Sequence, residues 1–137
     1  MSWDQSLIRL STYEVEVMQK RLAEIADRRE QAEIALAVLI AEGEAEMANA
    51  SNCPEANWYH AGFAAGLRVR KAAAQAEIDR IALEEAGARE ALTEAFEEQK
   101  KYEQVAEGIR LKRAKETARR ETAALDELGL RRAAVVR

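Results

Sequence analysis

The chain is poor in the residues that build a compact core or a disulfide framework. Its 137 residues include one cysteine, one proline and only 5% aromatic side chains. A lone cysteine cannot pair within the chain, which favours a reducing compartment and excludes a small secreted scaffold held by disulfides. So few aromatic side chains cannot anchor a large globular core, and an elongated helical protein fits this composition better.

Long hydrophobic runs are also missing. The longest is IALAVLIA, residues 34–41, which is far shorter than the roughly 20 residues that a membrane span needs. At the N-terminus, Trp3 and Asp4 stand where a signal peptide would have its basic region, and Arg9 interrupts any apolar segment. We therefore expect a soluble cytoplasmic protein.

What the chain does contain is charge and heptad periodicity. Charged residues make up 34% of it, a bias typical of long helices or coiled coils. In the first half, apolar positions follow alternating steps of three and four, with Arg29 as the charged member, and this spacing keeps one helix stripe facing a partner helix. The stripe consists of Ile8, Val15, Met18, Leu22, Ile25, Arg29, Ala32, Leu36 and Leu39. The pattern predicts one helix over about residues 4–48.

A second, weaker stripe follows Pro54 and predicts a helix over about residues 55–128, with a tail at 129–137. Its members are Ile78, Ile81, Ala88, Leu92, Ala95 or Phe96, Tyr102, Val105 or Ala106, and Ile109. Alanine fills many of the positions between them, and small residues let two helices approach closely while burying less area per turn.

The segment 49–54 reads as the tip between two antiparallel helices, because a short connection makes helices neighbours. Pro54 suits a first helical turn, and Ser51, Asn52 or Cys53 would cap it. The sequence thus predicts an all-α fold: one domain, residues 1–137, forming a long two-helix antiparallel coiled-coil hairpin. Folded at the tip, the first helix would run out near residue 102 and leave a C-terminal helical overhang of roughly 25 residues.

Charge divides the chain in the same way. Residues 100–137 carry a net charge of +5, whereas residues 1–99 carry −9. The densest basic stretch is IRLKRAKETARRE, residues 109–121. A basic projecting helix suggests an acidic protein surface or an anionic polymer as its partner. Nucleic acid is the weaker option, because the basic stretch has no interleaved aromatic residues and the whole chain is acidic.

Catalytic or metal chemistry has little support in the sequence. Cys53 and His60 are seven residues apart, but a zinc site would need further ligands and the chain has no second cysteine or histidine. A thiol nucleophile would need an orienting acid and an enclosed pocket, which a hairpin tip does not offer. No glycine-rich phosphate loop occurs. We expect a non-enzymatic protein with no cofactor and no metal.

Apolar residues outside the main stripes have two interpretations each. Trp58, Tyr59, Phe63 and Leu67 either pack on Val38, Leu39 and Met47 of the first helix, or form an exposed patch that docks a partner. Leu7 and Leu10, with Tyr13 and Val17, either pack on the C-terminal part or face a partner.

Two stretches resemble the FliJ family of flagellar export proteins. SLIRLSTYEVEVMQKRLAEI, residues 6–25, is similar to the start of the family, and ALTEAFEEQKKYEQVAEGIRLKRAKETARRETAALDEL, residues 91–128, is similar to its C-terminal half. In layout the resemblance covers nearly the whole chain, although the family's motifs are diffuse.

The resemblance implies a central-stalk component of the export apparatus, similar in shape to the gamma subunit of rotary ATP synthases. Its joined termini would enter a hexameric flagellar export ATPase and promote assembly, and other surfaces would touch the cytoplasmic part of the export gate and export chaperones. The ring-binding residues expected here are Leu7, Leu10, Arg110, Lys112, Arg113, Lys115, Arg119 and Arg120. The gate-binding residues expected are Trp58, Phe63, Leu67, Arg70 and Ala74; of these, Phe63 and Leu67 match the family's apolar face, whereas Arg70 and Ala74 depart from its pattern.

The protein would then be a monomeric hairpin in the cytoplasm at the base of the flagellum. It would be associated with the membrane only through its partners. The alternatives are a self-associating coiled-coil scaffold or adaptor, since the heptad stripe suits a dimer equally well, and the equivalent stalk of a virulence injectisome.

Overall fold

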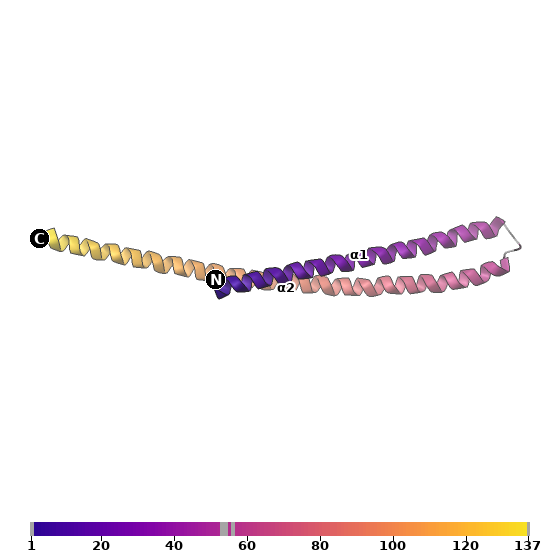
Figure 1. Cartoon of the computed structure of the whole chain (residues 1–137), viewed down its shortest axis with the longest axis horizontal. Coiled ribbons are helices and arrows are strands. Elements are labelled where there is room, and N and C mark those ends of the chain that lie inside the picture. The colour runs from indigo at the N-terminus through magenta and orange to yellow at the C-terminus, as the bar shows by residue number, and fades with distance from the viewer. Residues whose placement is uncertain (1, 53–54, 56, 137) are drawn as a thin grey trace. The chain divides into compact units, whose positions relative to one another are not determined.

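Two long helices make up the part of the chain that the computed structural model describes, residues 2–52, 55 and 57–136. Helix α1 spans Trp3–Asn52 and helix α2 spans Asn57–Val136 (Figure 1). These described residues contain no strand, so the prediction of an all-α fold is confirmed. Cys53 and Pro54 of the predicted tip lie outside the described residues. The other two cap candidates, Ser51 and Asn52, belong to α1, so the prediction that one of them caps the second helix is wrong.

Both helices continue beyond their predicted ends. Helix α1 was expected to stop at Ala48 but continues to Asn52, and α2 continues to Val136. The prediction of a separate tail from residue 129 is therefore wrong. Its physical reason is that Gly129 does not adopt the positive φ of a helix-ending glycine, so the helix passes through it.

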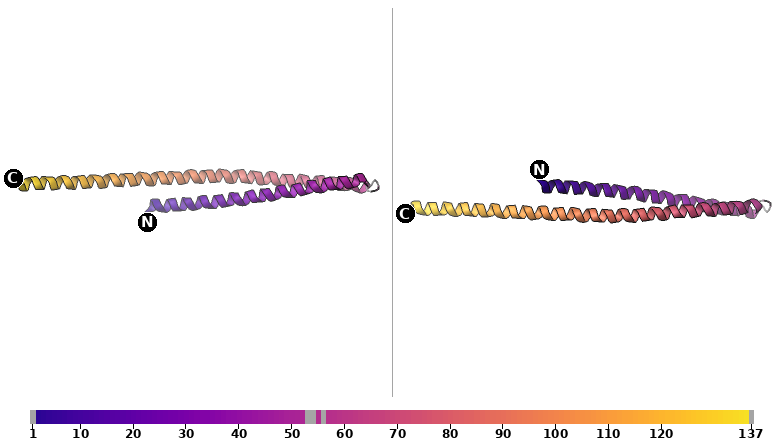
Figure 2. Two further views of the ribbon diagram at one scale, coloured as in Figure 1. Left: turned by 90° about the horizontal axis from the view of Figure 1, so that it is seen from above. Right: turned by 90° about the horizontal axis from the view of Figure 1, so that it is seen from below.

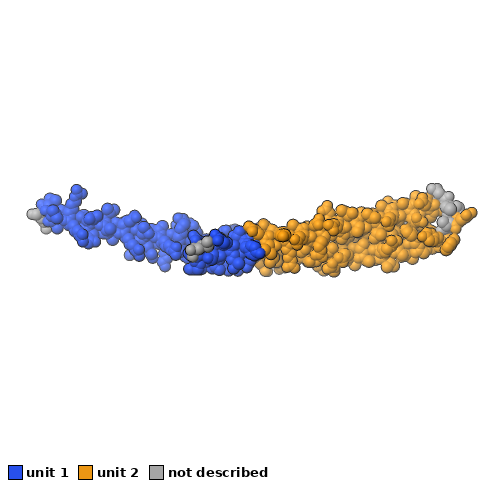
Figure 3. Space-filling view, in the orientation of Figure 1, with its two compact units in different colours: residues 1–15, 95–137 blue, residues 16–94 orange. Residues whose placement is uncertain are grey.

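The chain divides into two units, coloured in Figure 3. Unit 1 consists of Met1–Val15 and Ala95–Arg137, and unit 2 consists of Glu16–Glu94. Each unit contains a part of both helices. Whether the chain forms one domain stays a prediction.

In unit 2, α1 and α2 lie side by side and run antiparallel (Figures 1 and 2). Their core centres on Ile25 and Ile81, which are 2% and 3% exposed, together with Ala88. Leu22 and Ala32 pack against this cluster. All of these residues belong to the predicted stripes, so the heptad assignment in this unit is confirmed.

A charged layer interrupts the apolar seam of unit 2. Arg29 occupies a stripe position on α1, and its Nε donates a hydrogen bond to Oε2 of Glu85, a buried residue on α2. Glu85 also accepts a hydrogen bond from Arg89 at 2.8 Å, and Arg29 donates one to Glu33 at 3.0 Å. The sequence identified Arg29 as the charged member of its stripe but not its partner.

Unit 2 also contains a close approach at Gly43. A Cβ atom built on Gly43 would lie 2.5 Å from Cδ2 of Leu67, a buried residue on α2. The leucine side chain thus occupies the space that any larger residue at position 43 would fill. By contrast, Cβ atoms built on Gly62 and Gly66 would meet no atom within 4 Å.

In unit 1, the first turns of α1 pack on α2 mainly through small and polar residues, with Ile8 and Ile109 half-buried beside them. Ser11 and Ala95 are buried there, and the Gln99 amide donates a hydrogen bond to Oγ1 of Thr12 at 3.0 Å. The structure also decides which residue belongs to the stripe of α2 at the two positions that the sequence left open. Ala95 is buried while Phe96 is exposed, and Ala106 is half-buried while Val105 is exposed.

The paired part of unit 1 extends further along α2 than expected. Ser2 and Asp4 share a cavity with Arg110 and Arg113, so the prediction that pairing ends near residue 102 is wrong. The end of the pairing lies further along α2 because α1 continues to Asn52, so the chain reverses direction later than expected. The hydrogen bond between Thr12 and Gln99 shows the resulting alignment of the two helices. Every described residue of 111–136 is exposed. Beyond Arg113, which lines the cavity, α2 has no helix beside it in unit 1 (Figures 1 and 2).

Candidate partner-binding surfaces

The exposed end of α2, residues 111–136, carries most of the predicted ring-binding cations. Lys112, Arg113, Lys115, Arg119 and Arg120 are all exposed there. In the described part of the chain, no ion pair involves any of these five residues. Their charges therefore remain available to an anionic surface.

Arg110 differs from these cations because it is already paired. Its guanidinium donates hydrogen bonds of 2.6 and 3.0 Å to the carboxylate of Glu107, one turn earlier on α2. This bond raises the pKa of Arg110 and lowers the pKa of Glu107. Because the pair is exposed and lies within one helix, it adds little to stability and leaves Arg110 only partly free for a partner.

The apolar stripe of α2 changes face at the start of this exposed segment. Continuing the seam beyond Ile109 in steps of four and three leads to Arg113, Glu116 and Arg120, which are charged. The apolar residues follow a different line, which begins two residues after Ile109 and so lies about 200° around the helix. That line contains Leu111, Ala114, Ala118, Leu125 and Leu128. The segment thus has an apolar face that α1 does not cover.

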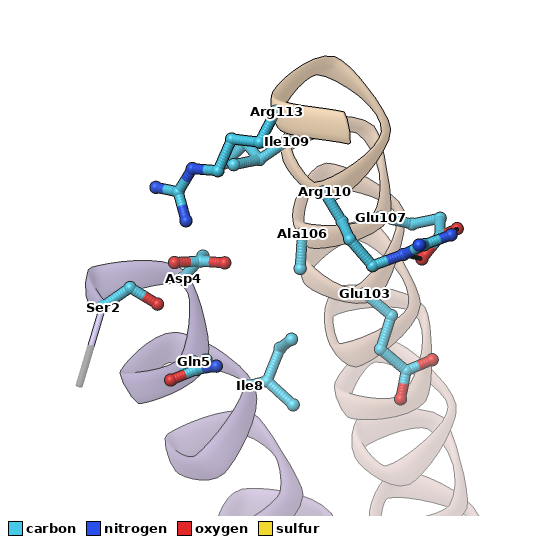
Figure 4. Close-up of a pocket in the computed structure, with 10 residues that line it drawn as sticks. All are labelled: Ser2, Asp4, Gln5, Ile8, Glu103, Ala106, Glu107, Ile109, Arg110 and Arg113. Carbon is cyan, nitrogen blue, oxygen red and sulfur yellow. Dashed lines mark hydrogen bonds and ion pairs between the residues drawn. The ribbon is translucent and has the colours of Figure 1, made fainter. Parts of the chain in front are cut away.

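A cavity of about 410 Å³ opens between the first turn of α1 and α2 in unit 1 (Figure 4). Asp4, Gln5 and Ile8 line it from α1, and Ile109 and Arg113 are among the residues that line it from α2. The predicted ring-binding residues Leu7 and Leu10 do not line it. Leu7 is half-buried and Leu10 is exposed, so only Leu10 offers a free apolar side chain there.

The predicted gate-binding residues lie near the tip of unit 2 in different environments. Leu67 is buried against Gly43, and Ala74 is half-buried on the seam face. Phe63 is half-buried, with the Arg70 guanidinium carbon 5.9 Å from its ring centre, a cation–π geometry. Trp58 is 82% exposed. A partner can therefore reach Trp58, Phe63 and Arg70, whereas Leu67 serves the packing of the hairpin.

The apolar residues near the tip were expected either to pack on α1 or to form an exposed patch, and the structure shows some of them in each environment. Phe63 and Leu67 line a groove of about 260 Å³ with Met47 of α1, as the packing interpretation expects. Trp58 and Tyr59 instead stay exposed and contact each other edge to face, with ring centres 6.2 Å apart. The exposed pair has the residue types that protein interfaces favour.

No group of three or more metal-ligating side chains comes together in the described part of the chain. His60 lines the groove near the tip, where its Nδ1 has no hydrogen-bond partner among the described residues, and Cys53 lies outside them. Neither helix has a stretch in its described residues that is long and apolar enough to cross a membrane.

Sequence reasoning did not single out the buried polar residues of the seam. Glu85, Ser11 and Asp4 are all buried. Each falls on a position that extends a predicted stripe in steps of three and four, and this regular spacing was the available signal. From the sequence, Asp4 was assigned as the start of the first helix and as a residue that disfavours a signal peptide, but not as a buried residue.

Taken together, the antiparallel pairing of α1 and α2 and the heptad stripes along their seam define an antiparallel coiled-coil protein. Comparison with known sequences gives the particular family. The chain matches the Flagellar FliJ protein family over residues 5–136 and belongs to it, which makes it a component of flagellar export.

Two curated relatives are similar over most of their length. They are the Flagellar FliJ proteins of two Caulobacter vibrioides strains, NA1000 / CB15N and ATCC 19089 / CIP 103742 / CB 15. Each is 53% identical over 105 residues, which cover 77% of this chain and 76% of the relative. No solved structure matches the chain. Between the two secretion systems considered, these matches support the flagellar one.

Proposed function

We propose that this chain is a non-enzymatic stalk of the flagellar export apparatus, acting in the cytoplasm at the base of the flagellum. Its N-terminal turns and the exposed end of α2 would enter a hexameric export ATPase and promote its assembly and activity. The observation that carries this proposal is the unpaired helical segment 111–136, with its free cations and uncovered apolar face.

Physical chemistry supports a partner for this segment. Its 26 residues would span about 39 Å as a helix, and an isolated helix is only marginally stable in water. Burial of Leu111, Leu125 and Leu128 against another protein would supply the missing stabilisation. The basic residues around them favour an acidic lining. A stalk of this kind does no chemistry but shifts the ring between states through contacts that differ between subunits.

The test is ATP hydrolysis and hexamer formation by the cognate export ATPase. We compare the full chain with a truncated chain that ends at Arg113, which keeps every α2 residue that lines the cavity shared with α1. We expect the full chain to raise the rate and drive hexamer assembly and the truncated chain to do neither. Circular dichroism and sedimentation of the truncated chain show that its paired part still folds.

A charge-reversal pair isolates the role of the cations. Lys112→Glu with Lys115→Glu places two negative charges on the exposed segment, and Lys20→Glu with Arg21→Glu makes the same charge change on unit 2, where both residues are exposed. Only the first pair should weaken stimulation. Full stimulation by the first pair would remove these lysines from the mechanism, and stimulation by the truncated chain would contradict the proposal as a whole.

The gate and chaperone contacts belong to the same proposal but use other surfaces. The accessible residues near the tip, Trp58, Phe63 and Arg70, offer an aromatic and cationic patch for the cytoplasmic part of the export gate. Export chaperones would bind the remaining coiled-coil surface. Pull-down of the purified gate domain by wild-type chain and by Trp58→Ala with Phe63→Ala tests this contact, which the double variant should lose.

A second candidate, a self-associating scaffold, is favoured by two large apolar side chains on the outer face of α2 in unit 2. Val69 and Leu83 are both exposed there, and a partner helix from a second copy would cover them. Sedimentation equilibrium separates the candidates, because the stalk proposal expects a monomer at micromolar concentration and the scaffold expects a dimer or larger assembly.

A further inference from the structure

Asp4 is a buried carboxylate that lacks a full set of partners. It lies in the first turn of α1 and is 8% exposed, and its Oδ1 atom has no hydrogen-bond partner among the described residues. The positive end of the helix dipole favours an anion there. A buried carboxylate oxygen without a partner is nevertheless unfavourable unless a cation approaches it. This environment calls for a nearby positive group.

Arg113 is the cation placed to fill that role. It lines the same cavity from α2, and its side chain extends across the cavity toward Asp4 (Figure 4). The other charged groups lining the cavity are Glu103, Glu107 and Arg110. Arg110 is held by Glu107, and the Glu103 carboxylate points away from Asp4 (Figure 4). Of the two cations that line the cavity, Arg113 is therefore the one that is held by no ion pair with another described residue.

The electrostatics of Asp4 agree with this geometry. A hydrogen bond from the Ser2 side chain lowers the pKa of Asp4 most, and burial opposes that effect. The backbone N–H groups of Asp4 and Gln5 lower the pKa further, and the charge of Arg113 makes the smallest contribution in the same direction. The carboxylate thus stays charged at neutral pH while facing the guanidinium across the cavity. The open volume of the cavity leaves room for the arginine side chain to move toward the carboxylate or away from it.

The rest of the seam in unit 1 holds the first turns of α1 only lightly. Buried Ser11 faces inward where unit 2 has isoleucine, and it hydrogen-bonds to the carbonyl oxygen of Ile8 in its own helix. On α2, Ala95 and Gln99 offer little apolar area. Since apolar burial sets most of the free energy of helix pairing, a single charge pair at the end of α1 has a large influence on whether these turns stay docked.

We propose that Asp4 and Arg113 form a releasable latch that holds the first turns of α1 on α2, and that an acidic partner surface opens it by competing for Arg113. The latch itself depends only on this chain. The competition rests on the proposed function, in which the partner is the export ATPase. The N-terminal turns would then become free to contact that partner while Arg113 binds it.

Hydrogen–deuterium exchange of the full chain tests the latch without any partner. The variants are Arg113→Gln, Asp4→Asn and the two combined, and the controls are Lys112→Gln and Lys115→Gln, which remove neighbouring charges that do not line the cavity. We expect amides of residues 7–12 to exchange about two- to fivefold faster in each latch variant, as the loss of one weak attraction between charges across a solvent-filled cavity implies. The controls should match the wild-type chain.

Two further readouts distinguish a charge pair from a purely structural effect. The combined variant should exchange no faster than Arg113→Gln alone, because each substitution removes the same interaction. Added salt should speed exchange in the wild-type chain but not in Arg113→Gln. Wild-type exchange in Arg113→Gln, equal acceleration in the lysine controls, or full additivity in the combined variant would overturn the latch.

Binding of the export ATPase then tests the competition. Asp4→Asn frees Arg113 and should bind the ATPase about two- to fivefold more tightly, whereas Arg113→Gln should bind more weakly. If Asp4→Asn and the wild-type chain bind the ATPase with equal affinity, the partner does not compete with Asp4 for Arg113. The existence of the latch is then decided by hydrogen–deuterium exchange alone. If the wild-type chain does not bind the ATPase at all, the proposed function fails, and exchange still decides whether the latch exists.

Discussion

Arg29 of α1 and Glu85 of α2 form an ion pair between two stripe positions, and this pair fixes how the helices of unit 2 align. Glu85 is 6% exposed and the Arg29 guanidinium reaches it directly across the seam. This hydrogen bond raises the pKa of Arg29, with a smaller contribution from Glu33. Any slip of one heptad would place an apolar side chain against one of the two charges, so the pair disfavours other registers.

We predict that breaking this pair on one side destabilises the hairpin, because a buried carboxylate would lose its cation. Arg29→Ala should lower the Tm by roughly 3–6 °C in thermal melts followed by circular dichroism. Replacing both residues, Arg29→Leu with Glu85→Leu, should restore the Tm or raise it, since an apolar pair avoids the desolvation of two charges.

The double variant Arg29→Leu with Glu85→Leu should no longer hold α1 and α2 in a single register. Engineered cysteine pairs placed across the seam would then cross-link in more than one register, whereas the wild-type chain cross-links in one. A double variant that is both less stable than Arg29→Ala and uniform in register would contradict this account.

We predict that truncation of the central isoleucines costs about 2–5 kcal/mol of unfolding free energy each. Ile25→Ala and Ile81→Ala remove side chains at the centre of the unit 2 cluster. The matched control is Leu83→Ala, because Leu83 is 76% exposed on the same helix as Ile81 and its loss should change stability by only about 0.5 kcal/mol. Urea titration gives all three values. A large effect at Leu83 would show that its surface is covered by a second copy in solution.

Substitutions at two glycines should have opposite signs. Gly43→Val should destabilise by about 1–3 kcal/mol, because its side chain would displace Leu67 from the space it fills. Gly66→Ala should stabilise by about 0.5–1 kcal/mol, since a Cβ there meets no atom within 4 Å and alanine is the better helix former. Urea titration of both variants measures the difference, and a neutral Gly43→Val would show that the seam is looser than this contact implies.

Heptad spacing was sufficient to predict both helices of this fold, because a stripe that repeats in steps of three and four can be buried only by a second helix. Ile25 and Ile81 could be assigned to the core in this way. The helix ends could not, since Gly129 looks like a terminator but does not adopt a positive φ.

The candidate site was harder to predict than the fold. Arg113 could be recognised as part of a basic stretch, but its relation to Asp4 depends on where the hairpin turns, and residues 49–52 look like a loop although they are helical. The residues alone left packing and partner binding open for Leu67, and the family resemblance implied that it binds the export gate. Its burial depends on Gly43, which no local pattern connects with it.

We predict that acid weakens unit 2 through its exposed ion pairs. The Arg28 guanidinium lowers the pKa of Glu84 by hydrogen bonds of 3.0 and 3.3 Å, and Arg80 lowers the pKa of Glu77. Each carboxylate therefore contributes stability above its unfolded pKa, near 4.5, and loses it as the pH falls through the lower folded value.

The size of this acid effect should be small, because the pairs are exposed. The fall in Tm between about pH 5 and about pH 3 should be smaller in Glu84→Gln with Glu77→Gln than in the wild-type chain. Glu90→Gln with Glu94→Gln is the matched control, since neither residue forms an ion pair with another described residue. An equal reduction in that control would assign the acid sensitivity to overall charge instead of these pairs.

We predict that alanine substitutions near the tip have two different effects: some weaken binding of the export gate, and others weaken the packing of the hairpin. Trp58→Ala and Phe63→Ala should each weaken binding of the export gate by about 2 kcal/mol, because aromatic side chains that become buried dominate the affinity of interfaces. Trp58→Ala should keep the thermal stability of the wild-type chain, because Trp58 is 82% exposed. Phe63→Ala should lower it less than Leu67→Ala does, because Phe63 is half-buried whereas Leu67 is buried. Calorimetric titration with the purified gate domain, paired with thermal melts, measures both properties.

Leu67→Ala should show the opposite behaviour. It should lower the unfolding free energy by about 2–5 kcal/mol, because it empties the space beside Gly43, and any loss of gate binding should be recovered at low temperature, where the hairpin is folded. Gly43→Ala combined with Leu67→Ala refills part of that space and should regain some stability. If Leu67→Ala is as stable as the wild-type chain yet fails to bind the gate, then Leu67 leaves the seam to meet the partner, and the gate must open the two helices at the tip.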